Sequence, residues 1–435
     1  MLNRRQLLGA AGAAGIGLAA AACGTTSSTT AAKTPAKVDS NATLKGTLNL
    51  LTPEFAGTEG KAALEGKVLK GFTAKHPDVK FQVDYTPWDK LNEKLSTQIA
   101  GGSPSDIIMF GMGWTQPFAQ KKIVAEIDKT AIGADDVVPN LLENASYDGK
   151  LFSVPMHLES RPFIFRKDIL GKAGITEDDM NVDTIDEFTA MLKEIKGATG
   201  KTPLDMLTSS LRQAWGQMIF AFGGTQFAPD GMSITFDQEP GIKALQWMVD
   251  LQKEGLSDFT QRVATGQPGP YQTGKAMIGW QSSGVWPTFS KQAPDLLKED
   301  ALGIMLCPGP SADTKVIYQG GTLAALSARS KNPEAAIAAI AYMMSDEGLS
   351  EQIRFTGKVP ARKIPADPEI DANKLAAFSA ENLQYSVTDG GTPAWMEIRG
   401  KMDPVMEAAV LGKKSVKDTI AELKQLSEDA IGRVK

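Results

Sequence analysis

The sequence is poor in the residues on which much site chemistry depends. Its 435 residues include two cysteines, Cys23 and Cys307, and two histidines, His76 and His157. Two cysteines cannot build a disulfide framework or a four-cysteine zinc site, and two distant histidines leave little for histidine-based metal chemistry. A formal net charge of −5 provides no basic footprint for nucleic acid. We therefore expect no metal, no cofactor and no nucleic-acid partner.

Catalytic motifs are missing as well. The sequence has no Gly-x-Ser-x-Gly elbow, and its histidines are not close to a candidate nucleophile. The glycine-rich stretches at 223–225 and 320–322 lack the Gly-Lys-Ser/Thr ending of a phosphate-binding loop. These absences predict that the chain is not an enzyme.

The composition is that of a globular protein. Hydrophobic residues make up 42% of the chain and charged residues 22%. A length of 435 residues is too great for one ordinary core and suggests two or three domains. We find no internal repeat.

The first 43 residues have the pattern of an export signal followed by a tether. Arg4 and Arg5 precede an apolar run that is shorter than the roughly 20 residues of a membrane-spanning helix. The paired arginines resemble a twin-arginine signal, and small residues directly before Cys23 resemble a lipoprotein signal, although Ala20 stands where leucine is usual. Residues 23–43 are rich in Thr, Ser and Ala, which cannot bury a core. We predict a signal peptide over 1–22 and a flexible tether over 23–43.

The start of the folded part alternates between strand and helix patterns. Apolar residues at 44–51, strict alternation at 79–85 and a short apolar run at 107–110 predict three strands. Residues at helical spacing between them, around Val68 and Leu95, predict two helices. This β-α-β-α-β order favours a mostly parallel sheet covered by helices.

Local signals place several later elements. Thr184 and Glu187 form a capping box that opens a helix. Pro240 opens another helix, with Ile242, Leu245 and Val249 facing inward. From Pro404 to the C-terminus the pattern is helical, with no strand. Cys307 lies in an apolar run, which favours a buried side chain over a reactive thiol.

Several segments, taken in order, resemble the extracellular solute-binding proteins of ABC importers, in the family that includes maltose-binding protein. The resemblance covers most of residues 44–435, and the segments that carry it are Leu48–Glu54, Phe72–Val79, Lys94–Ile108, Phe165–Leu170, Gly274–Gly279 and Gly357–Arg362.

This resemblance implies an α/β fold of two lobes joined by hinge strands, with the ligand in the cleft between them. It implies a first lobe of residues 44–157 plus 314–363 and a second of 158–313 plus 364–435. The expected function is capture of a mono- or oligosaccharide for the membrane permease. The implied protein is a monomer on the outer face of the cell membrane, held there by a lipid on Cys23.

By position in the family pattern, ten residues are candidates for the ligand site. A sugar offers an apolar C–H face for aromatic rings and hydroxyls for charged or amide groups. The candidates are Glu54, Phe55, Phe110, Met112, Trp114, Glu159, Trp215, Trp280, Trp286 and Trp395. We interpret Trp88 and Trp247 as structural. Arg161, Arg212, Arg362 and Arg399 lie near these segments and suit either salt bridges or an anionic ligand.

Three alternatives stay open. Near relatives bind polyols or glycerophosphodiesters with similar patterns. An enzyme acting on glycosides needs two carboxylates facing one cleft, and Glu54 and Glu159 are the only pair suggested for that role. A surface adhesin would be more repetitive or richer in strands than this sequence.

Overall fold

The structure is a computed structural model that describes residues 43–102, 105–264, 267–297, 301–311 and 314–435. The predicted signal peptide, Cys23 and all of the tether except Thr43 lie outside these residues. Within the described part of the chain, no helix combines the length and apolar character needed to cross a bilayer.

The larger sheet is built around β1, and its main path runs β13-β6-β12-β3-β1-β2. β1 is parallel to β2 and β3, whereas β12 is antiparallel to β3 and β6. β11 and β14 pair with β12 off this path. The strands are β1 (Gly46–Thr52), β2 (Val79–Tyr85), β3 (Ile107–Gly111), β6 (Val154–Arg161), β11 (Cys307–Pro308), β12 (Lys315–Leu326), β13 (Val359–Pro360) and β14 (Ser386–Val387).

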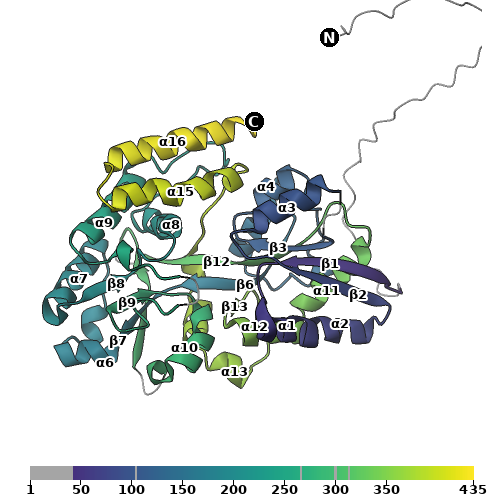
Figure 1. The fold of residues 1–435 in the computed structure, drawn as a ribbon, viewed down its shortest axis with the longest axis horizontal. Helices are drawn as coiled ribbons and strands as arrows, with labels where there is room; N and C mark the ends of the chain where they lie inside the picture. Colours follow the sequence, from purple (N-terminus) through teal and green to yellow (C-terminus); the bar gives the residue numbers. More distant parts are fainter. Residues whose placement is uncertain (1–42, 103–104, 265–266, 298–300, 312–313) are drawn as a thin grey trace, which may run out of the picture. The chain divides into compact units, whose positions relative to one another are not determined.

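Helices cover both faces of β1, β2 and β3, as parallel strands require. In Figure 1, α3 and α4 lie on one face and α1, α2 and α12 on the other. A π-helical stretch, Leu64–Leu69, joins α1 to α2. The helices associated with this part are α1 (Gly57–Ala63), α2 (Lys70–Lys75), α3 (Leu91–Ala100), α4 (Thr115–Gln120), α5 (Pro139–Asn144), α11 (Pro333–Met344), α12 (Asp346–Thr356), α13 (Pro368–Asp371) and α14 (Lys374–Glu381).

A second sheet has four strands in the order β10-β7-β9-β8. Its strands are β7 (Phe163–Arg166), β8 (Thr202–Asp205), β9 (Ala276–Trp280) and β10 (Leu302–Met305). The associated helices are α6 (Lys167–Leu170), α7 (Ile185–Thr199), α8 (Leu211–Ala221), α9 (Glu239–Lys253), α10 (Trp286–Gln292), α15 (Trp395–Val410) and α16 (Val416–Gly432). α15 packs against α8, α9 and α16.

The chain passes between the two sheets along extended segments. β6 is separated from β7 only by Pro162, and β10 leads through β11 into β12. Figure 1 shows β6 and β12 running side by side from the larger sheet toward the smaller one. These paired segments are the connections about which a hinge movement would have to occur.

The remaining elements are short. A hairpin of β4 (Ser146–Tyr147) and β5 (Lys150–Leu151) turns at Asp148 and Gly149, both at positive φ. The 3-10 turns are Thr130–Ile132, Gly171–Ala173, Asp178–Met180, Phe259–Gln261, Ser283–Val285, Pro294–Leu297 and Leu383–Tyr385.

Most local predictions are confirmed. The opening β-α-β-α-β order, the capping box of α7 and the burial of Cys307 are all present. Burial raises the pKa of the Cys307 thiol to about 12, which makes it a poor nucleophile.

One prediction is wrong in detail. Ile242 is 40% exposed on α9, whereas Leu245 is buried as predicted and Val249 is half-buried. The helical pattern from Pro404 onward is confirmed, with Pro404 inside α15 and α16 after it.

Candidate functional site

The loops that follow three parallel strands meet at one edge of the larger sheet. Thr52, at the end of β1, pairs in register with Tyr85, at the end of β2, and β3 lies on the other side of β1. Glu54 follows β1, Trp88 follows β2 and Trp114 follows β3. The carboxyl edge of parallel strands is the usual ligand-binding position in open α/β sheets.

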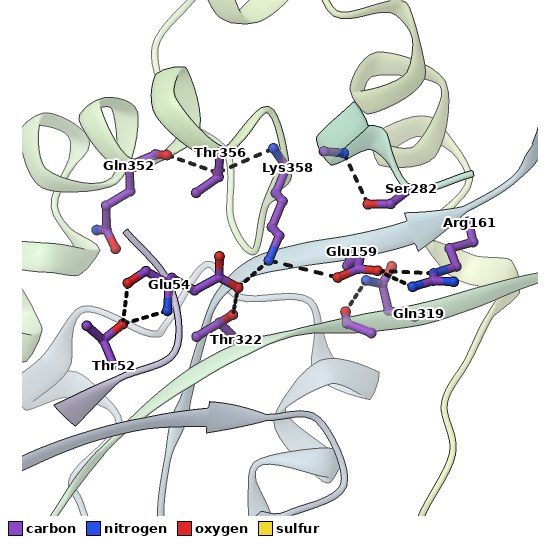
Figure 2. A network of polar contacts seen from close by, with 12 residues as sticks. Thr52, Glu54, Glu159, Arg161, Ser282, Gln319, Thr322, Gln352, Thr356 and Lys358 are labelled. Carbon is purple, nitrogen blue, oxygen red and sulfur yellow. Dashed lines mark hydrogen bonds and ion pairs between the residues drawn. The ribbon is translucent and has the colours of Figure 1, made fainter. Parts of the chain in front are cut away.

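Glu54 is held at this edge by neighbours from two distant segments. The hydroxyl of Thr322 on β12 donates to its Oε1 at 2.9 Å, and the ammonium of Lys358 donates to the same oxygen (Figure 2). Burial would raise the pKa of the Glu54 carboxyl, but Lys358, His157 and Thr322 together hold it below its ordinary value. Glu54 is therefore an ionised, paired carboxylate.

A close approach of two strands places Thr322 beside Glu54. Gly321 has φ +147, and a Cβ there would lie 2.7 Å from the carbonyl oxygen of His157 on β6. The register of β6 and β12 shifts just after Thr322. Glycine is required at position 321, because a side chain would push β12 away from β6.

Lys358 links Glu54 to a second carboxylate. Its Nζ lies 3.9 Å from Oε2 of Glu159 on β6 (Figure 2). Burial would lower the pKa of Lys358, but Glu54 and Glu159 raise it above its ordinary value. β13 pairs with β6, and this pairing brings Lys358, the residue before β13, to Glu159. A buried ammonium between two carboxylates satisfies the pairing that a buried charge requires.

Glu159 and Arg161 form the more open part of the cluster. Nε and Nη2 of Arg161 both donate to Oε1 of Glu159, at 3.1 and 2.6 Å. The side chains of Glu159 and Arg161 are 26% and 17% exposed, whereas that of Glu54 is 13% exposed. The geometry of the Glu159–Arg161 pair is therefore fixed before a ligand binds, and its polar atoms are partly exposed to that ligand.

Aromatic rings border the Glu159–Arg161 pair. The Arg161 guanidinium lies 4.8 Å from the Trp280 ring centroid and 5.9 Å from that of Tyr318. The Trp280 indole donates to Gln217 at 2.9 Å, and Gln213 donates to the Tyr318 hydroxyl at 2.9 Å. Both rings are nearly fully buried and their polar atoms are already bonded, so they pack against Arg161 as a fixed support.

Helix α15, which precedes the last helix α16, carries Trp395 and Arg399. Arg212 of α8 pairs with Asp389 and lies 5.3 Å from the Trp395 ring, while Arg399 lies 4.8 Å from the Trp114 ring. Burial, as the largest influence, lowers the pKa of Arg212 to about 10, so the guanidinium stays charged at neutral pH. Each of these two arginines therefore lies beside a tryptophan: Arg212 beside Trp395 on α15, and Arg399 beside Trp114 after β3.

Other predicted residues lie in packed surroundings. Phe55 stacks on Phe355 at 5.5 Å, Phe110 contacts Phe118 at 5.0 Å, and the Trp215 indole donates to Gly241 at 2.9 Å. Met112 is buried, and its N–H donates to Gly321 at 3.2 Å. Packing accounts for these side chains, and a direct role in ligand contact stays a prediction for each.

Trp286, at the start of α10, has a different setting. It lines a cavity of about 250 Å³ together with Gly357, Lys358 and Asn373. Lys358 is therefore shared between this cavity and the Glu54–Glu159 pair. In the described part of the chain, no three His, Cys, Asp or Glu side chains gather as metal ligands would.

Sequence reasoning missed the residues that organise the cluster. Lys358 falls in Gly357–Arg362, a segment used for the resemblance, but its partners became visible only through the pairing of β13 with β6. Trp88 was interpreted as structural, and this stays untested. It is 39% exposed, the most exposed of the tryptophans, and stands three residues after β2 as Trp114 does after β3.

Comparisons with known proteins agree with this architecture. A family model described as bacterial extracellular solute-binding protein matches residues 56–349. The diacetylchitobiose binding protein DasA of Streptomyces coelicolor is 25% identical over 433 residues, with 97% of each chain covered.

Solved structures are similar over nearly the whole folded part. The GacH receptor of Streptomyces glaucescens, determined unliganded and with acarbose, has a TM-score of 0.75 at 20% identity and covers 90% of this chain and 100% of its own. UgpB from Mycobacterium tuberculosis, in complex with glycerophosphocholine, has a TM-score of 0.74 at 18% identity and covers 89% and 99%. This likeness confirms the predicted two-lobed α/β fold.

Proposed function

We propose that this chain, which belongs to the family of bacterial extracellular solute-binding proteins, captures a carbohydrate and delivers it to the permease of an ABC importer. The observation that carries the proposal is the Glu159–Arg161 pair, partly exposed beside Trp280 and Tyr318. Similarity to a diacetylchitobiose binding protein along almost the whole chain supports the choice of a sugar.

The chemistry of the pair suits sugar hydroxyls. A hydroxyl both donates and accepts, so it can donate to a carboxylate oxygen of Glu159 and accept from Arg161. Lys358 and Arg161 hold Glu159 in place before the ligand arrives, which reduces the entropy lost on binding. The neighbouring Trp280 and Tyr318 rings are nearly fully buried and pack against Arg161, which helps to fix its guanidinium.

The same electrostatics favour binding over hydrolysis. A glycoside hydrolase needs one carboxylic acid that is protonated near neutral pH. The pKa of Glu54 lies below its ordinary value, so Glu54 would not be that acid. Together with the family match, this supports our proposal of a binding protein without catalytic activity, which returns its sugar unchanged after prolonged incubation.

Ligand capture is proposed to close the two lobes. The lobe limits implied by the sequence, 44–157 plus 314–363 and 158–313 plus 364–435, stay part of this proposal. The paired segments β6 and β12 would bend as the lobes close, converting occupancy into a shape that the permease recognises.

Export and membrane attachment also belong to the proposal. Residues 1–22 would direct export, and a lipid on Cys23 would hold a monomer on the outer face of the membrane. Cys23→Ala is expected to move the protein from the membrane fraction to the soluble fraction. Continued sedimentation of the variant with membranes would contradict the lipid anchor.

A second candidate ligand is a glycerophosphodiester. Arg399 is largely buried, and its Nε has no hydrogen-bond partner in the described part of the chain. A guanidinium with an unused donor suits a phosphate oxygen.

A thermal-shift screen tests the proposal. Mono- and oligosaccharides, polyols and glycerophosphodiesters are added singly, and a bound ligand raises the unfolding midpoint by mass action. We expect a sugar to give the largest rise. A rise with glycerophosphocholine and none with any sugar would favour the second candidate.

A further inference from the structure

We propose that Trp88 is a stacking platform for an outer sugar unit, so that the ligand is an oligosaccharide. The inference rests on the proposed carbohydrate function and deepens it. Trp88 stands in the loop after β2, the edge strand beside β1, while the loops after β1 and β3 carry Glu54 and Trp114. The three loops share the carboxyl edge of β1, β2 and β3, where a ligand of this fold class is expected.

The setting of Trp88 differs from that of the other tryptophans. It is 39% exposed, whereas Trp114, Trp215, Trp280 and Trp395 are at most 2% exposed. A lone exposed apolar residue needs no explanation by itself. Trp88, however, belongs to a row of contacts that runs through Trp114 to Arg399 on α15.

The row begins where Trp88 packs edge-on against Trp114, with ring centroids 6.3 Å apart. Trp114 in turn lies 4.8 Å from the guanidinium carbon of Arg399. Trp114 is nearly fully buried, so Trp88 is the member of this row that offers open ring surface. The row therefore extends the candidate site outward along the loops after β3 and β2.

The Trp88 ring is held in position before any ligand binds. A Cβ on Gly111, the last residue of β3, would lie 3.3 Å from Cζ3 of Trp88 and 3.2 Å from Nε1 of Trp114. Glycine at position 111 thus lets both rings approach the strand end closely. Trp88 combines a supported edge with exposed ring surface, and such a ring stacks on a sugar at low cost in conformational entropy.

This placement predicts a dependence on ligand length. A short sugar would occupy the Glu159–Arg161 region and leave Trp88 uncovered. A longer sugar would continue along the row and cover the Trp88 ring with an outer unit. Trp88 would then determine preference among sugars of different length without being needed for binding of the shortest.

Calorimetry with length series tests the inference. The full chain, Trp88→Ala, Trp88→Phe and Ile242→Ala are titrated with chito-, malto- and arabino-oligosaccharides of one to five units. Ile242 is the control because it is similarly exposed, at 40%, and lies on α9 outside the three loops. In the series that binds, we expect Trp88→Ala to weaken the longest sugar about tenfold and the shortest less than twofold. Trp88→Phe should retain most of the affinity, and Ile242→Ala all of it.

A second readout is fluorescence quenching by acrylamide. Exposure makes Trp88 the most accessible tryptophan, so a long sugar should protect the wild type from quenching more than a short one does. This difference should disappear in Trp88→Phe. Equal unfolding midpoints for wild type and variants would show that the folds are intact.

The possible failures are distinguishable. A wild type that binds sugars, but whose affinities are unchanged by Trp88→Ala at every length, would overturn this inference alone. Equal weakening at every length, or binding of monosaccharides only, would also overturn it. A wild type that binds no sugar would overturn the proposed function and this inference with it.

Discussion

His157 is buried on β6 beside Glu54 and Lys358. Both of its ring nitrogens lack a hydrogen-bond partner in the described part of the chain, and its ring lies 6.0 Å from that of Phe55. Burial first and Lys358 second lower the pKa of His157 from 6.5 to about 3, against an opposing influence of Glu54. The imidazole is therefore neutral in the folded protein at neutral pH.

The depressed pKa of His157 makes stability depend on pH. Below pH 6.5 the His157 imidazole binds a proton in the unfolded chain but stays neutral in the folded chain. The free energy of unfolding therefore falls as pH decreases toward 3. The slope is at most about 1.4 kcal/mol per pH unit. His157→Leu should flatten the curve between pH 6.5 and 4.5 in urea unfolding. An equally steep curve for His157→Leu would contradict the account.

Single residues could be named as candidates where the family pattern defined their position. Glu54 and Glu159 were named because each lies in or just after a strand of that pattern, and their contact with a ligand stays a prediction. Lys358 was missed because its importance comes from two carboxylates that lie 304 and 199 positions away in sequence. No local pattern contains that information.

At the scale of elements, the capping box of α7 is a feature that can be predicted from neighbouring residues alone. The Thr184 side chain accepts from the Glu187 N–H, and the Glu187 side chain accepts from the Thr184 N–H. These bonds satisfy orphan donors at the start of the helix. The prediction is confirmed because every interacting group lies within four residues.

Thr184→Ala is expected to lower the free energy of unfolding by about 1 kcal/mol, since it removes one half of the box. Thr184→Ser keeps the hydroxyl and should have a much smaller effect. Chemical denaturation of the three proteins measures the difference. If both variants unfold at the same denaturant concentration as the wild type, the box does not stabilise the protein.

Longer-range features of the elements were not predictable. On α9 the inward position of Leu245 is confirmed, but Ile242 is exposed because tertiary contacts bury Trp247 and Met248 instead. The position of β12 between β3 and β6 depends on pairing between residues more than 150 positions apart. Sequence periodicity identifies a strand but not its distant neighbours.

At the scale of the whole molecule, the account requires closure on ligand binding. Small-angle scattering should show a smaller radius of gyration with a saturating amount of the sugar found in the thermal-shift screen. A sugar that gives no thermal shift serves as the control. An unchanged radius at full occupancy would contradict closure and leave binding itself unaffected.

The two-lobed fold could be predicted from the order of weak segments, whereas the ligand could not. Many sugars share hydroxyls and C–H faces, so the residue types at the site indicate a class of ligand more readily than one compound. The lobe boundaries likewise depend on long-range contacts and stay a prediction.

Titration calorimetry of Glu159→Gln tests the central claim most directly. The matched control is Asp168→Asn, because Asp168 also pairs with an arginine two positions away, Arg166, through two bonds of 2.7 Å. The account predicts one sugar per wild-type chain, unchanged affinity in Asp168→Asn, and a loss of about 1.5–3 kcal/mol of binding free energy in Glu159→Gln. Equal affinity of Glu159→Gln and wild type for the sugar would contradict the account.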